Sequence, residues 1–221
     1  MVSVTVRSES GSSVSEETAK KRISPMIDET KGPMRGVILD GVEKYMMSIS
    51  VHHAVRVAFD GLPFDRPSIS PDAIDVICSV KIPDGDAMRV GHSDRRVFVE
   101  CGSITISAIE MSGDLMPRDL LNGFFSRAMD ACLVTVQVDR DDLLAAAKRC
   151  APLSDDTHGL VLIIDGSSIA VTSRRDGSEI LNTVAAKSDG SLTIGVVAKY
   201  LIQALQNLNH KHATLRLSEP L

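Results

Sequence analysis

Apolar and polar residues alternate in short runs along most of the chain, a pattern typical of β-strands with one buried face. In the first half, these runs predict strands near residues 2–7, 36–40, 45–50, 54–59, 87–91, 95–101 and 103–110. In the second half, they predict strands near residues 133–138, 160–164, 168–173, 179–185, 191–195 and 212–217. The chain is therefore expected to be rich in sheet.

Two segments of the first half space their apolar residues at helical intervals instead. The first covers residues 15–27, with an apolar stripe of Ala19, Ile23, Met26 and Ile27. The second opens with Ser70, Pro71 and Asp72, which suit the N-cap, the first helical position and an acidic first turn. Both segments are predicted to be helices.

Two further helices are predicted in the second half. One follows Asp139, a suitable N-cap, and its buried stripe is expected to be Leu143, Leu144, Ala147 and Cys150. The other covers about 196–206, and its buried stripe is expected to be Val197, Tyr200, Leu201, Ala204 and Leu205.

The order of these elements repeats along the chain. A Lys-Arg-x-x-Pro segment occurs at 21–25 and again at 148–152, and strands that end in Asp-Gly occur at 36–41 and 159–166. Each repeat consists of one strand, one helix and three strands, and two such units form a domain. We therefore predict an α+β fold with two helices against sheets in each domain.

The repeat predicts two domains, at residues 1–115 and 127–221, joined by a linker at 116–126. The stretch that leads into and through this linker contains Gly113, Pro117 and Gly123, which favour loop structure. The last repeat is expected to be incomplete, because only one strand follows its helix. By comparison with the first domain, it ends about 25–30 residues early.

Composition and charge exclude several classes of function. A hydrophobic fraction of 43% with 24% charged residues is typical of a folded soluble protein. The net charge of −5 argues against a surface that grips DNA everywhere, although it permits a local basic patch. Scarce aromatic residues, 3% of the chain, argue against a binder of single strands by base stacking. With neither a signal peptide nor a long apolar segment, the expected location is the cytoplasm, away from membranes.

No group of residues suggests catalysis. The four cysteines lie tens of residues apart, which favours reduced thiols over a zinc site. His52 and His53 are neighbours on a predicted strand and would point to opposite faces, so they cannot hold one metal ion together. The chain has no phosphate-binding glycine loop and no nucleophile elbow. We therefore expect no enzyme activity, cofactor or metal site.

Two segments of the second domain resemble the bacterial DNA polymerase III beta subunit, the sliding clamp. Residues 138–149 are similar to the first helix of its last domain, and residues 192–205 to the second, including the Ile-Gly entry and the Ala-Lys-Tyr-Leu core. The first domain resembles the family's middle domain at 36–40, 69–71 and 97–109. The resemblance begins near residue 13, and the family's first domain has no counterpart.

The resemblance implies a DNA-clamp fold and a protein that encircles duplex DNA of any sequence and tethers a polymerase. Inner helices of a clamp offer positive charge to phosphates. On helical wheels the corresponding residues are Lys20, Lys21, Arg22, Lys148, Arg149 and Lys199, although such residues also occur on ordinary solvated faces. Clamp rings contain six such domains, so a two-domain chain would form a homo-oligomer of three copies if it closed a ring.

The resemblance also implies a pocket for short peptides of a polymerase and a clamp loader. Its wall would include Met34, His53, Val55 and Pro117. The family's Thr-Asp-Gly-His-Arg-Leu motif is replaced by Val-His-His-Ala-Val-Arg at 51–56, its Phe-Pro-Asp-Tyr linker by Met-Pro-Arg-Asp at 116–119, and its closing tail has no counterpart. An alternative is therefore a truncated or degenerate clamp that acts as a protein-interaction module and does not encircle DNA.

Overall fold

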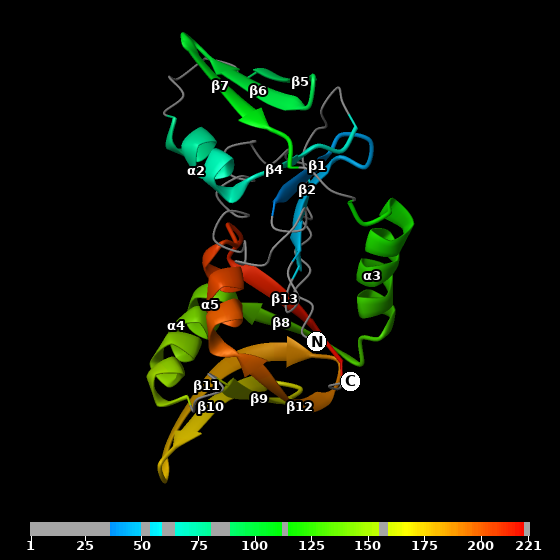
Figure 1. The fold of residues 1–221 in the computed structure, drawn as a ribbon. Helices are drawn as coiled ribbons and strands as arrows, with labels where there is room; N and C mark the ends of the chain where they lie inside the picture. Colours follow the sequence, from blue (N-terminus) through cyan, green and yellow to red (C-terminus); the bar gives the residue numbers. More distant parts are fainter. Residues whose placement is uncertain are drawn as a thin grey trace. The chain divides into compact units, whose positions relative to one another are not determined.

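A computed structural model describes residues 36–49, 54–58, 65–80, 89–111, 115–154 and 159–218. The chain separates between Pro117 and Arg118 into two compact units (Figure 1). The described residues up to Pro117 are called the first unit below, and those from Arg118 onward the second unit. The strand predicted at 2–7 and the helix predicted at 15–27 lie outside the described residues.

The first unit contains two antiparallel sheets and one described helix. The four-stranded sheet has the order β3-β2-β1-β4, from β1 (Val37–Asp40), β2 (Tyr45–Ile49), β3 (Ala54–Ala58) and β4 (Ser68–Ile69). Helix α2 (Pro71–Ser79) follows β4. The second sheet has the order β5-β6-β7, from β5 (Arg89–Ser93), β6 (Arg96–Cys101) and β7 (Ile104–Ile109). Among the described residues, a bridge between Ile69 and Glu110 connects the two sheets.

Apolar side chains from both sheets and from α2 form one core in the first unit, including Val37, Met46, Ile69, Ile74, Val97 and Val99. A buried ion pair lies at the end of β1, where Asp40 Oδ2 is 3.4 Å from Arg66 Nε. Arg66 Nη2 also donates a 2.7 Å hydrogen bond to the Met116 carbonyl. The ion pair therefore fastens the last residues of the first unit to its first described strand.

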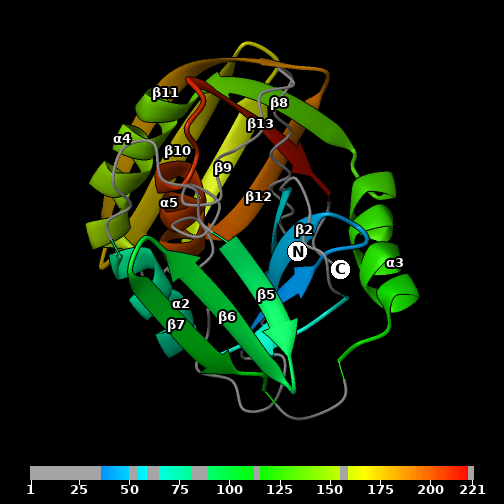
Figure 2. The same ribbon diagram turned by 90° about the horizontal axis from the view of Figure 1, so that it is seen from above.

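The second unit is built on one six-stranded antiparallel sheet with the order β12-β9-β10-β11-β8-β13 (Figure 2). Its strands are β8 (Val134–Asp139), β9 (Gly159–Asp165), β10 (Ser168–Arg175), β11 (Ser178–Ser188), β12 (Ser191–Val197) and β13 (His212–Leu217). Its helices are α3 (Arg118–Asp130), α4 (Arg140–Cys150), the short 3-10 helix η3 (Ala151–Leu153) and α5 (Ala198–Gln206).

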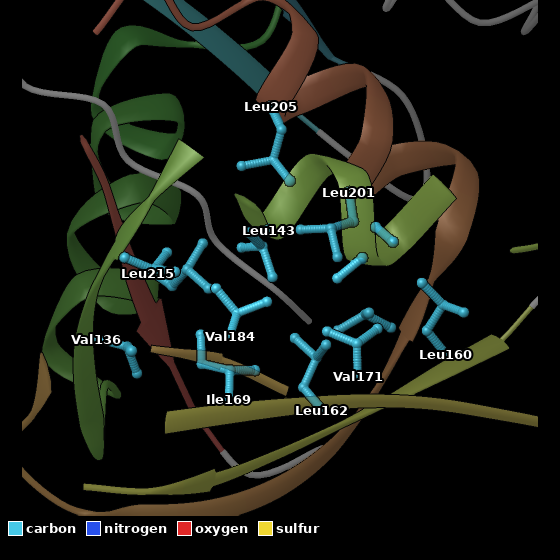
Figure 3. Close-up of a cluster of buried hydrophobic side chains, with 14 of the residues drawn as sticks. Val136, Leu143, Leu160, Leu162, Ile169, Val171, Val184, Leu201, Leu205 and Leu215 are labelled. Atoms are coloured by element: carbon cyan, nitrogen blue, oxygen red, sulfur yellow. The ribbon is translucent and has the colours of Figure 1, made fainter. Parts of the chain in front are cut away.

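Helices α4 and α5 pack side by side on one face of this sheet (Figures 1 and 2). Figure 3 shows Leu143, Leu201 and Leu205 from the helices pointing toward apolar side chains of the strands, among them Leu162, Ile169, Val171 and Val184. Alternate residues of each strand share a face, so the other residues of these strands face away from the helices.

The predicted repeat of strand, helix and three strands is confirmed twice. It occurs as β4-α2-β5-β6-β7 in the first unit and as β8-α4-β9-β10-β11 in the second. The strand predicted at 212–217 matches β13 at both ends, and the N-cap roles of Ser70 and Asp139 are confirmed. The α+β fold is therefore the predicted one.

Two details of the prediction are wrong. The linker predicted at 116–126 is mostly helix α3, because Leu120, Leu121 and the residues around them favour a helix strongly enough to outweigh the single Gly123. Val197 was expected inside the buried stripe of the last helix, but it is 40% exposed. It is the last residue of β12, whose odd-numbered residues face away from the helices.

Candidate nucleic-acid interface

Helix α4 begins at a well-formed cap. The Asp139 carboxylate accepts hydrogen bonds from the backbone amides of Asp141, at 2.9 Å, and Asp142, at 3.2 Å. These bonds hold the pKa of Asp139 below its ordinary value. The bond from the Asp142 amide has the largest effect, and the bond from the Asp141 amide has a smaller one. The helix buries Leu143, Ala146, Ala147 and Cys150 and ends with Lys148 and Arg149 exposed in its last turn. Cations at this position also complement the negative end of the helix dipole.

Helix α5 begins differently. Strand β12 runs directly into it, and its N-cap residue Val197 makes no side-chain hydrogen bond to the helix. Its first turn contains no acidic residue and carries the exposed Lys199. The helix is held by its buried residues Ala198, Leu201 and Leu205. The N-terminal end of α5, which is the positive end of its helix dipole, therefore has no side-chain cap and lies next to the Lys199 cation.

Arg140 shows how the two helices run relative to each other. Its Nη1 donates to the carbonyl of Leu208, and its backbone amide donates to the Lys211 carbonyl at 2.8 Å. The start of α4 thus lies at the end of α5, so the helices are antiparallel. The end of α4, with Lys148 and Arg149, consequently lies near the start of α5, with Lys199.

The three described DNA-contact candidates, Lys148, Arg149 and Lys199, are therefore brought to one end of the helix pair. Within the described part of the chain, neither lysine makes a side-chain hydrogen bond or ion pair. Arg149 Nε donates to Asn182 Oδ1 at 2.8 Å. The acidic side chains of α4, Asp141 and Asp142, lie at the other end, where Asp141 pairs with Arg140 at 2.7 Å. One end of the helix layer is thus cationic, which suits the phosphates of a nucleic acid.

Helix α2 of the first unit has the opposite character. Its exposed residues include Asp72 and Asp75, and it contains no basic residue. Ser70 Oγ accepts a 3.2 Å hydrogen bond from the Ala73 amide, which closes the start of this helix. This helix therefore offers phosphates no attraction, as its sequence indicates.

The other candidate residues are less informative. Lys20, Lys21, Arg22, Met34 and His53 lie outside the described residues. Of the remaining candidates for a peptide pocket, Val55 is half-buried against the core of the first unit and Pro117 is exposed. Their role in a pocket stays a prediction.

Three residues in or beside the helix pair were not anticipated. Arg140 joins the two helices, Asn182 holds Arg149, and Lys211 lies exposed just before β13. The position of Arg140 directly after the Asp139 cap places it at a helix start, but the sequence does not show which carbonyl it reaches. The proximity of Asn182 to Arg149 depends on how β11 packs under α4, for which no local signal exists.

The described residues show no basis for bound metal. No group of three or more His, Cys, Asp or Glu side chains among them could hold a metal ion. A hollow of about 370 Å³ in the first unit is lined by Asp94, Arg95, Arg96, Ile109 and Glu110, whose charges have both signs. Nor is any helix of the described part long and apolar enough to cross a membrane.

Comparison with known proteins identifies the fold. No protein-family model matches the chain. No curated protein matches it either. Among solved structures, the beta sliding clamp of C. crescentus matches with a TM-score of 0.77 at 16% identity, over 98% of this chain and 62% of that one. The DNA polymerase III subunit beta of Pseudomonas aeruginosa matches with a TM-score of 0.74 at 15% identity, over 97% of this chain and 62% of that one.

The beta subunit from the DNA polymerase of Streptococcus pyogenes gives a similar result, with a TM-score of 0.75, 16% identity, and coverage of 98% and 61%. The fold of this chain is therefore that of a sliding clamp. More narrowly, it is the fold of the bacterial DNA polymerase III beta subunits, and the predicted resemblance is confirmed. The chain spans about three fifths of the length of the clamps it matches. At these identities the likeness shows the fold and leaves the activity to be tested.

Proposed function

We propose that this protein is a sliding-clamp-like processivity factor of DNA replication, which encircles duplex DNA and tethers a polymerase without catalysing a reaction. One observation carries the proposal: antiparallel packing of α4 and α5 gathers Lys148, Arg149 and Lys199 at one end of an exposed helix layer, on the fold of a clamp. Such charges attract phosphates without contacting base edges, which permits movement along any sequence.

The charges of the described helices set the expected strength of this interaction. Helix α4 carries three basic and two acidic residues, α5 one basic residue, and α2 two acidic residues. The attraction is therefore local and weak, and retention on DNA must come mainly from a closed ring. Six clamp domains in a ring correspond to three copies of a two-domain chain, joined head to tail.

A topological experiment tests this function. The protein is loaded onto linear duplex DNA whose ends are then blocked with bulky protein, and retention at moderate salt is compared with that on DNA with open ends. A ring slides off open ends and stays between blocked ends. Light scattering of the same protein without DNA should give the mass of three chains. A monomer that is lost equally from both substrates would contradict the proposal and would support a protein-interaction module instead.

Tethering requires a contact with the polymerase, which we propose is made through short clamp-binding peptides. The altered segment at 51–56 lacks the spacing of the family motif, so a consensus peptide should bind less tightly than to a complete clamp. We expect at least a tenfold weaker affinity, which corresponds to about 1.4 kcal/mol. Titration of a labelled peptide against both proteins measures this difference, and equal affinities would show that the altered segment does not limit binding.

A further inference from the structure

We propose that Asn182 is a positioning residue that holds the Arg149 guanidinium ready for a DNA phosphate. This inference rests on the proposed function, because it concerns the same cationic end of the helix pair. Asn182 lies on β11, on the face of the sheet that α4 covers, and its Oδ1 accepts a 2.8 Å hydrogen bond from Arg149 Nε. Lys148 and Lys199 have no comparable support in the parts of the chain that the structure describes.

The orientation of the Asn182 amide is determined by its two neighbours. A guanidinium can only donate hydrogen bonds, so the amide oxygen must face Arg149. The Asn182 Nδ2 group then donates to Cys150 Sγ at 3.3 Å. Cys150 is fully buried, and its own sulfur lies 3.3 Å from the Val171 carbonyl as a donor. The amide is therefore held from below by the core and cannot turn away from Arg149 without losing both contacts.

A second bond fixes the same corner of the helix. Ser173 Oγ, buried on β10, donates a 2.7 Å hydrogen bond to the backbone carbonyl of Cys150, the last residue of α4. The backbone next to Arg149 is thus tied to the sheet as firmly as its side chain. Hydrogen bonds therefore hold Arg149 at two points: the main chain beside it and its side-chain Nε.

The outer edge of the guanidinium has no partner in the described part of the chain. An arginine has five N–H donors, and the bond to Asn182 uses the one on Nε. Among the described residues, no acceptor is found for the four N–H groups on the two terminal nitrogens. These nitrogens form the planar fork that binds two oxygens of one phosphate. Because the side chain is already ordered, less conformational freedom is lost when a phosphate binds.

A purely structural role for Asn182 makes a different prediction. A hydrogen bond that only fastened α4 to β11 would change stability when removed, but would affect DNA binding equally with or without Arg149. A positioning role requires that the effect of Asn182 on DNA binding disappear once Arg149 is gone. A double-mutant cycle distinguishes the two.

The test measures the affinity of the complete protein for a blunt duplex by fluorescence anisotropy over a range of KCl concentrations. Arg149→Gln should weaken binding and reduce the slope of log K against log salt by about one. Asn182→Ala should weaken binding by about fivefold in the parent. In the Arg149→Gln background, Asn182→Ala should cause no further loss. Asn207→Ala, which removes a side-chain bond to the Gln203 carbonyl at the other end of the helix pair, is the matched control and should leave affinity unchanged.

Asn182→Leu covers the case in which the alanine variant does not fold. It nearly keeps the shape of the side chain, adds no charge and cannot accept a hydrogen bond from Arg149, so it should weaken binding only when Arg149 is present. Equal losses in both backgrounds would overturn the positioning role while leaving the DNA interface intact. An Arg149→Gln variant that binds like the parent would instead refute this part of the proposed DNA interface, and the inference with it.

Discussion

Helices α2 and α5 occupy the same place in the repeat, each following the strand that opens the second half of its unit, yet their first turns are opposite. Helix α2 has a serine cap, a proline at its start and an acidic first turn. Helix α5 has no side-chain cap, no acid and a lysine in its first turn. Caps and acids at this position satisfy amides and complement the helix dipole, so α2 has the arrangement that favours stability.

The difference does not extend to packing. Helix α2 buries Ile74 and Ile77 to 1% and 5% exposure, and α5 buries Leu201 and Leu205 to 4% and 0%. Both helices are therefore held to their sheets by comparable apolar contacts, and only their ends and charges differ. The comparison shows that α5 lacks the stabilising cap and acid of α2 and carries a lysine in its first turn instead.

The largest expected effect concerns the buried apolar contacts that hold both helices to their sheets. Leu205→Ala in α5 and Ile74→Ala in α2 should each lower the free energy of unfolding by about 3 kcal/mol, because each leaves a cavity in a buried core. Urea denaturation followed by circular dichroism measures both. The exposed Gln206→Ala is the control, with a change within about 0.5 kcal/mol. A markedly smaller loss for Leu205→Ala would mean that α5 is less firmly docked than α2.

The second effect concerns charge. Reversal of Lys148, Arg149 and Lys199 to Glu should weaken duplex binding at least about tenfold for every sequence tested, because only phosphates are contacted. Replacing Asp72 and Asp75 of α2 by Lys should strengthen binding if α2 also faces DNA. Affinity titrations at fixed salt measure both variants.

The control for this pair reverses Arg174 and Lys187, exposed residues on the face of the second unit's sheet that points away from the helices. These changes should leave affinity nearly unaltered. If they weaken binding as much as the helix variant does, the attraction reflects net charge rather than a defined interface.

A third prediction exchanges the helix starts. Ser70→Ala should cost α2 about 1 kcal/mol of stability, through loss of its hydrogen bond to Ala73, with no loss of DNA affinity. Val197→Asp should give α5 the cap it lacks, raising stability while weakening duplex binding a fewfold through repulsion of phosphate. Thermal melts and anisotropy on the same samples check this opposition. A Val197→Asp protein that binds DNA normally would show that the open end of α5 is not used.

The smallest effect is a pH dependence at the cap of α4. Because the Asp142 amide lowers the pKa of Asp139 in the folded state, this carboxylate contributes stability above its unfolded pKa of about 4. The contribution is lost as the pH falls through the lower folded value. The Asp139→Asn variant would keep a cap that does not titrate, so acid titrations of this variant and the parent protein should diverge below pH 4. Parallel curves would show that the ionised Asp139 carboxylate stabilises the start of α4 no more than a neutral Asn side chain does.

Sequence patterns predicted most of the sheet and three of the four described α-helices, because alternation and capping are local signals. Helix α3 was missed where Pro117 and Gly123 suggested a loop, although a proline just before a helix and one glycine within it are both tolerated. The exposed positions of Lys148, Arg149 and Lys199 follow from helical spacing. The contacts of Arg140 with Leu208 and of Arg149 with Asn182 join residues far apart in sequence, so no local pattern could predict them.

The bond between Arg66 and the Met116 carbonyl has a mechanical consequence. Met116 lies two residues before α3, and Arg66 in turn pairs with Asp40 at the end of β1. Tension applied along the backbone through α3 is therefore passed to the four-stranded sheet of the first unit at this point. Part of this load therefore bypasses β7, the strand that precedes Met116 in the chain.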